Sequence, residues 1–540
     1  MSQTSSDADY IAADYIAAEE QEQEQEQEQE QEQEQPAAND QQLKGCSKWC
    51  AWYQFQGCTM AKGYATLGVA RGAVVMSNIF LSTSLIYLAN EDAGCLDDET
   101  NEVIDDCNNR VYGQSPAALI ANIAVFSGLL SAFFMPLVGA MVDYTPHRRA
   151  IGIWVAVVLL CLQTVQIATI AQTWFAMAVL QGIAGFLYQM QVLATYAYLP
   201  DIARHVGASI MVSFQATFTM CQFAAQALFL IVIIGLSYIL NFEAVATGHL
   251  SQGINVVWSG LFFYFGWKLL PARPASHDIP VGKTLLTQSF VQVWQTTKVI
   301  NKLYAHSLRW FLLAVVFAEA AANAFTVVAV VFLDDQIGMT PQEIGIFFLV
   351  TLVFTLPGSL MGAWVTRKTS PMISYQGSML SLSITAIVGA LILEEGAIAI
   401  VYVWGCFIGI FLGWFYPVEN LAFSLLLPKG QEAEIAGFYV YCTQILGWLP
   451  PLIFSLLVEA DIHQRYGIMA VQGFFAVAIG IIFLLPKWDV AVEEVMRQDK
   501  INAEIDDRKT NDNGGAAVDV SKNAEILEQP TEEEATSNAV

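Results

Sequence analysis

Charge is scarce in this chain of 540 residues. Only 14% of its side chains are Asp, Glu, Lys or Arg, against about 25% in an ordinary soluble domain, and 55% are hydrophobic. A chain this long and this apolar cannot bury all of its apolar segments in one soluble core. The composition therefore excludes an ordinary soluble protein and predicts an integral membrane protein.

Basic side chains are the scarcer of the two charge types, with 24 Lys and Arg against 50 Asp and Glu. Most of the acidic residues lie before Lys62, between Glu91 and Asp106, or after Pro486. Phosphate binding needs clustered Lys and Arg, so we exclude a nucleic-acid partner. The acidic tails, residues 1–62 and 487–540, are expected to be disordered in the cytosol, since repeated Gln and Glu offer no apolar face to bury.

Sequence signatures of enzymes and ATP-driven pumps are also absent. The chain has no Gly-x-x-x-x-Gly-Lys, His-Glu-x-x-His or Gly-x-Ser-x-Gly motif, and none of its six His pairs at metal-ligand spacing. We therefore expect no enzyme, no metal and no cofactor. A cleavable signal peptide is not expected either, because the first apolar run begins near residue 64, behind the acidic tail.

Apolar runs long enough to cross a bilayer make up most of the remaining chain. A spanning helix needs roughly 20 residues at 1.5 Å rise each. We expect an all-α integral membrane fold with 12 transmembrane helices in two pseudo-symmetric six-helix bundles, residues 63–270 and 309–486, joined by a cytosolic linker at 271–308. The tenth span carries Pro417 and is expected to kink or break near its cytosolic end. The expected spans are 65–89, 117–142, 151–171, 174–198, 208–238, 253–270, 309–333, 343–365, 372–393, 397–427, 435–458 and 466–486.

Lys and Arg in the connections indicate the orientation. They recur on one side of the predicted bundles, whereas the other side holds only Arg110 and Arg465. Positive charge stays in the cytosol, so both termini are expected there and the acidic loop 90–116 faces a lumen or the exterior. In that loop Cys95 and Cys107 can form a disulfide if the compartment is oxidising, and otherwise they remain free thiols.

A short internal echo supports two related halves. Gly139-Ala-Met-Val-Asp143 closes the second span, and Gly362-Ala-Trp-Val-Thr366 closes the eighth. Each segment precedes a pair of basic residues. Matching ends at matching positions favour two halves built on one plan.

The loop from Gly139 to Arg149 resembles the signature loop between the second and third helices of the major facilitator superfamily. Gly139 is expected to let another helix approach closely. Asp143 is placed to accept hydrogen bonds from Arg148 or Arg149, or from a helix N-terminus across the bundle. These four residues then form a conformational latch, although two arginines that only anchor the topology would give the same pattern.

Longer motifs narrow the resemblance. Gly63-Tyr-Ala-Thr-Leu-Gly-Val-Ala70, Tyr198-Leu-Pro-Asp201 and Leu427-Pro-Lys-Gly-Gln-Glu-Ala-Glu-Ile-Ala-Gly-Phe-Tyr439 look like the vacuole effluxer branch of that superfamily, known from fungal autophagy. The resemblance implies a vacuolar carrier that exports amino acids to the cytosol. The chain departs from the family where an acid is usual in span one, since it has Arg71, and where an arginine is usual in span ten, since it has Glu419.

Ionisable residues inside the predicted spans are candidates for binding a substrate or a proton, because each costs roughly 2.5–3.5 kcal/mol at the helix centre. Arg71, Glu319 and Glu419 are the strongest of these candidates. Asn78 shares a helix face with Arg71, and Asn323 shares one with Glu319. An ion pair between Arg71 and either glutamate would offset the cost of an unpaired charge. A structural hydrogen bond for Glu319 and snorkelling to the interface for Arg71 are the alternatives.

Polar side chains in spans four and five mark a second part of the candidate site. Gln189 and Gln222 can hydrogen-bond a zwitterion or a hydroxylated solute, or they can link helices at about 1 kcal/mol each. The same choice applies to Gln181, Tyr188, Gln215 and Gln226.

These features predict a secondary transporter in which two bundles rock about a midplane site. An amino-acid carrier leads, whereas a carrier for a sugar, an organic acid or another solute, and a solute sensor without transport, stay open. We expect a monomer in a lipid bilayer, the vacuolar membrane rather than the plasma membrane. Its small-molecule solute moves either with protons or passively.

Overall fold

Three long helices begin where the sequence places Ser or Thr before Pro. In each case the hydroxyl accepts a hydrogen bond from a backbone N–H in the first turn. The proline lacks an N–H at a position where that group would have no helical partner. The local sequence therefore fixes the start of α3 (Pro116–Tyr144), α11 (Pro341–Lys368) and α12 (Pro371–Ile392).

The computed structural model describes residues 55, 58–96, 107, 109–206, 208–272, 284–428 and 432–512. From residue 57 onward the chain forms one unit, whose described residues are helical and include no strand; Phe55 belongs to a separate unit, Met1–Gln56. The expected acidic tail 1–62 therefore lies almost entirely outside the described residues, as does the chain beyond residue 512.

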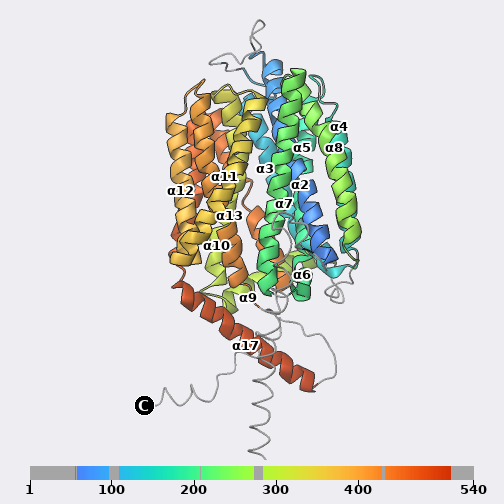
Figure 1. Cartoon of the computed structure of the whole chain (residues 1–540), viewed down its shortest axis with the longest axis vertical. Helices are drawn as coiled ribbons and strands as arrows, with labels where there is room; N and C mark the ends of the chain where they lie inside the picture. Colours follow the sequence, from blue (N-terminus) through green and yellow to red (C-terminus); the bar gives the residue numbers. More distant parts are fainter. Residues whose placement is uncertain are drawn as a thin grey trace, which may run out of the picture. The chain divides into compact units, whose positions relative to one another are not determined.

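Each half of the unit supplies a group of helices, most of them long, that run alongside one another (Figure 1). In the first half these are α2 (Thr59–Ala93), α3, α4 (Arg148–Gln166), α5 (Trp174–Tyr196), the short α6 (Leu199–Val206), α7 (Ala208–Leu240) and α8 (Ala244–Leu269). In the second half they are α10 (Leu308–Val331) with a π-helical extension Phe332–Gln336, α11, α12, α13 (Ile398–Leu425), α14 (Glu432–Gln444), α15 (Leu449–Glu459) and α16 (Gln464–Ile482).

Eleven helices in the described part of the chain are long and apolar enough to cross a membrane. The sixth expected span corresponds to α8, which runs beside α2 and α4 but is not among the eleven (Figure 1). The all-α membrane fold is therefore confirmed, and the count of twelve spans stays a prediction.

Polar residues explain why α8 is less apolar than its neighbours. Ser259 donates a hydrogen bond to the Ala70 carbonyl at 3.0 Å, and Gln252 donates one to the Ser77 carbonyl at 3.3 Å. Both donors are buried against α2. Hydrogen bonds of this kind attach helices to one another where lipid provides no hydrophobic drive for association.

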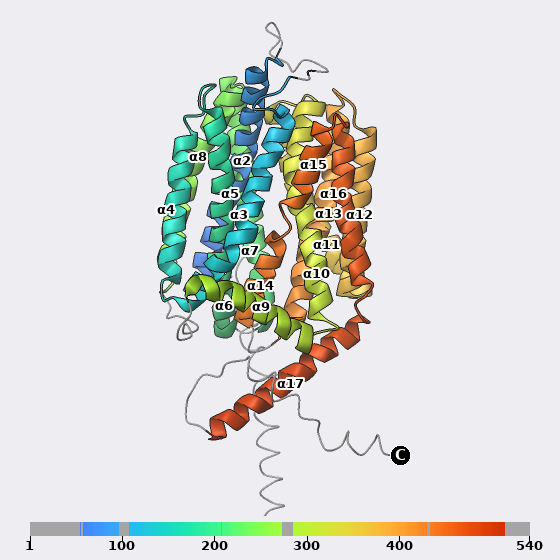
Figure 2. The same ribbon diagram turned by 180° about the vertical axis from the view of Figure 1, so that it is seen from behind.

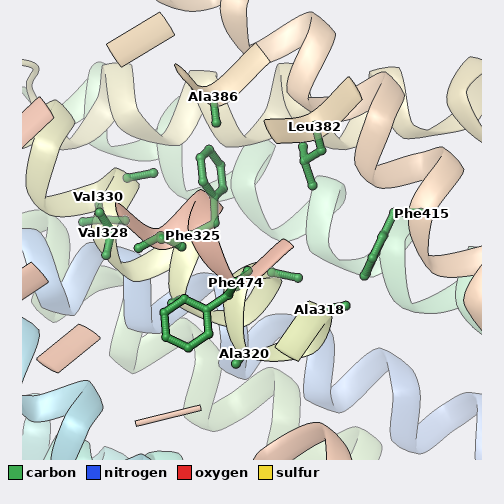
Figure 3. Close-up of a cluster of buried hydrophobic side chains, with 14 of the residues drawn as sticks. Ala318, Ala320, Phe325, Val328, Val330, Leu382, Ala386, Phe415 and Phe474 are labelled. Atoms are coloured by element: carbon green, nitrogen blue, oxygen red, sulfur yellow. The ribbon is translucent and has the colours of Figure 1, made fainter. Parts of the chain in front are cut away.

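The core of the second half is built around α10, most of whose side chains are buried. Figure 3 shows part of this core, where Ala318 and Phe325 of α10 gather with Leu382 of α12 and Phe474 of α16. Because α10 contacts several helices at once, it can place a polar side chain deep inside the bundle.

Glycines bring α11 and α13 into direct backbone contact. Gly405, Gly409 and Gly413 recur every fourth residue on α13. A Cβ atom at Gly409 would lie 2.2 Å from the Thr351 carbonyl oxygen, and one at Gly413 would lie 2.1 Å from the Thr355 carbonyl oxygen. This small-residue pattern permits close approach of two spanning helices.

The eleventh expected span, 435–458, is present as the segment Glu434–Glu459, which is long and apolar enough to cross a membrane, but its helix is interrupted. The structure divides it into α14 and α15, which are separated by residues 445–448. Pro450 and Pro451 follow the break, and their lack of N–H groups removes two helical hydrogen bonds. No break occurs at Pro417, since α13 continues from Ile398 to Leu425, and a kink there stays a prediction.

Two further helices lie at the end of the unit that carries α6 (Figure 2). The linker contains α9 (Leu285–Leu303), and α17 (Trp488–Asp512) occupies the first part of the tail that was expected to be disordered. Ala491 and Val495 of α17, one turn apart, are buried. A pair of apolar residues on one helix face explains why this acidic segment forms a helix against the bundle.

We predict that Gly409→Ala lowers the melting temperature of the purified protein in detergent. The added methyl group would overlap the α11 backbone, and overpacking of this kind costs about 1–3 kcal/mol. Gly480→Ala in α16 is the matched control, because a Cβ atom there meets nothing within 4 Å. Equal melting temperatures for the two variants would show that α11 and α13 are not packed through these glycines.

Candidate functional site

A cavity of about 590 Å³ lies between the two halves of the unit. Side chains of α2, α3, α5 and α7 form one side, and side chains of α10, α11, α13 and α14 form the other. Six of the seven residues expected to bind substrate or protons line it, namely Arg71, Asn78, Gln189, Gln222, Glu319 and Asn323. Gln181, Tyr188 and Gln226 line it as well, whereas the side chain of Gln215 lies outside the described part.

Arg71 is buried on the α2 side of the cavity, with 3% of its surface exposed. Its guanidinium carbon lies 5.7 Å from the centre of the Tyr64 ring, which is a cation–π contact. Tyr188 and Tyr196 of α5 are within electrostatic range of the same group. Arg71 therefore faces a wall of phenols, and the alternative that it snorkels to the membrane interface is wrong.

Glu319 lies on the opposite side of the cavity, in the middle of α10. Asn323, one turn further on, donates a hydrogen bond to Glu319 Oε2 at 3.2 Å. The same amide reaches the Thr443 carbonyl oxygen at 3.5 Å, next to the break between α14 and α15. The expected pairing of Glu319 and Asn323 on one helix face is thus present.

Glu419 stands behind Glu319 and is almost completely buried, with 1% of its surface exposed. It does not line the cavity. Tyr375 donates a hydrogen bond to Glu419 Oε2 at 2.7 Å, and Tyr439 donates one to Oε1 at 2.6 Å. Its carboxyl group also lies within electrostatic range of Glu319.

No ion pair joins Arg71 to Glu319 or Glu419 in the described structure, so the expected pairing of these charges is wrong. Phenols and a neighbouring carboxyl group surround the acids instead. The sequence pointed to Tyr188 but not to Tyr64 or Tyr439 as site residues, although these two lie within the motifs that resemble the effluxer family. Tyr375 carried no signal, because its role depends on a contact between α12 and α13.

A family model described as "Vacuole effluxer Atg22 like" matches residues 58–217 and 208–494. The chain belongs to the Atg22-like vacuole effluxer family. Among curated relatives, Autophagy-related protein 22-1 of Aspergillus clavatus is 22% identical over 44% of this chain and 39% of its own length. Autophagy-related protein 22-2 of Penicillium rubens is 24% identical over 50% of this chain and 47% of its own. The matches thus span less than half the length of these relatives.

Solved structures place the effluxer-family chain in the major facilitator fold. The human organic anion transporter MFSD10 (TETRAN) aligns over 78% of this chain and 99% of its own, with a TM-score of 0.54 and 11% identity. A D-xylose-proton symporter aligns over 81% of this chain and 99% of its own, with a TM-score of 0.53 and 12% identity. At such low identity the likeness shows the fold alone.

The two arginines that were expected to form a latch have other partners in this structure. Arg148 pairs with Asp201, whose carboxylate lies 3.5 Å from Nη1, and the same nitrogen donates to the Ala197 carbonyl at 2.9 Å. Arg149 Nε donates to the Trp267 carbonyl at 3.0 Å. The side chain of Asp143 lies outside the described residues, so its part in the latch stays a prediction.

The role expected for Gly139 is wrong. A Cβ atom at this position would meet nothing within 4 Å, because α3 borders a small cavity of about 70 Å³ here. Among the described residues, none approaches closely enough to require the glycine.

Cys95 and Cys107 form a disulfide, with their Cα atoms 5.6 Å apart. Arg110 follows shortly after and forms an ion pair with Glu459 of α15 at 3.1 Å. The backbone N–H of Ser115 donates to the same carboxylate at 2.7 Å. The bridged loop therefore leads into a contact between the two halves of the effluxer-family chain.

We predict that Arg148→Gln and Asp201→Asn each lower the melting temperature of the purified protein, and that the double variant loses less than the two single losses added together. Both side chains are buried, so removing one leaves the other charge without its partner at 3.5 Å. The coupling should be about 0.5–3 kcal/mol. Arg149→Gln combined with Asp201→Asn is the control and should be additive. An additive result for the Arg148 pair would contradict the ion pair.

Proposed function

We propose that the protein is a secondary transporter that moves a small solute by alternating access, and that the solute is an amino acid leaving the vacuole. The central cavity carries this proposal, because polar side chains from both halves converge on it. A site at the interface of two halves can be exposed to either side when the halves tilt. Membership in the effluxer family supports the vacuolar setting and the direction.

Polar contacts join the two halves at each end of the unit. At the end with the disulfide, Glu459 meets Arg110 and Ser115, and Gln342 of α11 donates to Ser237 Oγ at 2.7 Å. We assign this end to the lumen and place both termini in the cytosol.

The opposite end has its own polar contacts. Gln288 of α9 donates to the Tyr144 hydroxyl of α3 at 3.0 Å, and Thr296 of α9 donates to Glu434 of α14. The linker helix therefore contacts both halves. When the halves tilt, the hydrogen bonds at one end break and water replaces them. The hydrogen bonds at the other end are then the ones that are formed.

The adjacent carboxyl groups of Glu319 and Glu419 suit a proton-coupled cycle. Two carboxyl groups that share a site in a medium of low dielectric are suited to hold a proton, because two negative charges there would repel strongly. Glu319 faces the cavity and Glu419 is held from behind by two phenols. We infer that Glu319 takes up and releases the coupling proton.

The test is uptake of labelled amino acids by liposomes containing the purified monomer, with and without a proton gradient. We expect the gradient to raise accumulation in the wild-type protein and to have no effect in Glu319→Gln, because the amide cannot carry the proton. Glu395→Gln is the matched control, since Glu395 is exposed in the turn before α13.

Four results would contradict parts of this proposal. Binding without flux would identify a solute sensor. Flux of sugars or organic acids in place of amino acids would identify a different carrier. Amino-acid flux through the wild-type protein that does not depend on the proton gradient would identify a passive uniporter. A fluorescent fusion seen at the plasma membrane would contradict the vacuolar assignment.

A further inference from the structure

Arg71 is a buried cation whose hydrogen-bonding capacity is largely unused. A guanidinium carries five N–H donors on three nitrogens. Nε and Nη1 of Arg71 are buried and have no hydrogen-bond partner among the described residues. The centre of the Tyr64 ring lies 5.7 Å from the carbon of the same group, and those two nitrogens are left unbonded. Buried donors of a charged group that make no hydrogen bond are costly. Their natural partner is therefore an anion in the cavity.

The balance of charge in the cavity limits that anion to a single negative charge. Among the described residues that line the cavity, Arg71 is the one Lys or Arg, and Glu319 is the one acid. A dianion such as phosphate would leave a negative charge uncompensated in a low dielectric. A carboxylate matches both the charge and the donors of a guanidinium.

Elsewhere on the cavity wall, buried acceptors lack donors. Oδ1 of Asn78 and Oε1 of Gln181 have no partner in the described structure. The Gln181 amide nitrogen donates to Ser82 Oγ at 2.8 Å, which leaves its oxygen as the unbonded atom. Asn78 lies seven residues beyond Arg71, about 10 Å along the α2 axis. These oxygens and the Glu319 carboxyl group are acceptors on the cavity wall that an amine donor of a bound solute can use.

We propose that the cavity binds a solute through a carboxylate seated on Arg71. The proposal deepens the proposed function and rests on it. An ammonium group on the same solute can use whichever of the wall acceptors, on Asn78, Gln181 or Glu319, it reaches from there. A free monocarboxylate would use Arg71 alone, and an amine would use only the acceptors. Ile120, Ile123 and Phe347 also line the cavity and favour an apolar side chain on the solute.

The experiment measures how strongly three probes of similar shape displace labelled leucine from the purified protein in lipid nanodiscs. Leucine carries both charged groups, 4-methylpentanoate lacks the ammonium, and isopentylamine lacks the carboxylate. We expect leucine to bind tightest. Arg71→Gln should weaken the binding of leucine and of 4-methylpentanoate by roughly thirtyfold or more, which is the usual effect of truncating one member of a buried charge pair. It should leave isopentylamine unchanged.

Two further variants keep the test decisive. Asn78→Ala is the matched control on the same helix face, and it should leave the binding of 4-methylpentanoate unchanged, because Asn78 lies about 10 Å from Arg71 along α2. Arg71→Lys retains the charge but not the fork of donors, so it should lie between the wild-type protein and Arg71→Gln. This intermediate value remains measurable if Arg71→Gln fails to fold.

Two results would overturn the inference. One is leucine affinity in Arg71→Gln or Arg71→Lys within twofold of the wild-type value. The other is isopentylamine binding to the wild-type protein as tightly as leucine. Either result can occur while amino-acid flux through liposomes persists, so this inference can fail alone. Absence of both leucine binding and amino-acid flux in the wild-type protein would instead defeat the proposed function along with it.

Discussion

The cost of holding charge inside a lipid bilayer is the constraint on which the rest of this structure depends. Each ionisable group at mid-membrane depth costs several kcal/mol unless partners or water compensate it. Arg71, Glu319 and Glu419 all lie on inner helix faces, and large apolar side chains such as Ile239 and Val257 are exposed on the outside. The two halves therefore enclose the charges between them, and the cavity is the result of that arrangement.

A second consequence of the lipid environment is the way the helices attach to one another. Lipid tails are as apolar as leucine, so burial of apolar surface gives little drive for helix association. The helices associate instead through close backbone contact between α11 and α13 and through hydrogen bonds between α2 and α8. The break between α14 and α15 fits the same logic. It lies against Gly128 of α3 and beside the cavity, where irregular backbone is shielded from lipid.

The sequence predicts the membrane fold well because the governing signals are local. Apolar runs, Ser-Pro and Thr-Pro starts and the cost of buried charge are all visible within one helix, and they lead to Arg71, Glu319 and Asn323. What could not be predicted are contacts between helices distant in sequence. Asp201 as the partner of Arg148 and the two phenols on Glu419 depend on how helices are rotated against one another. The break after residue 444 is an intermediate case, since Pro450 and Pro451 signal it in hindsight.

The separation of Arg71 from the two glutamates gives the arrangement its mechanical sense. Arg71 belongs to α2 of the first half, and Glu319 and Glu419 belong to α10 and α13 of the second. A direct ion pair between them would hold the halves together whether or not solute was present, and would resist the tilt that alternating access requires. A solute that carries opposite charges can bridge the two halves only while it is bound. The stabilisation then comes from the solute, which is the condition for coupling its binding to the movement of the halves.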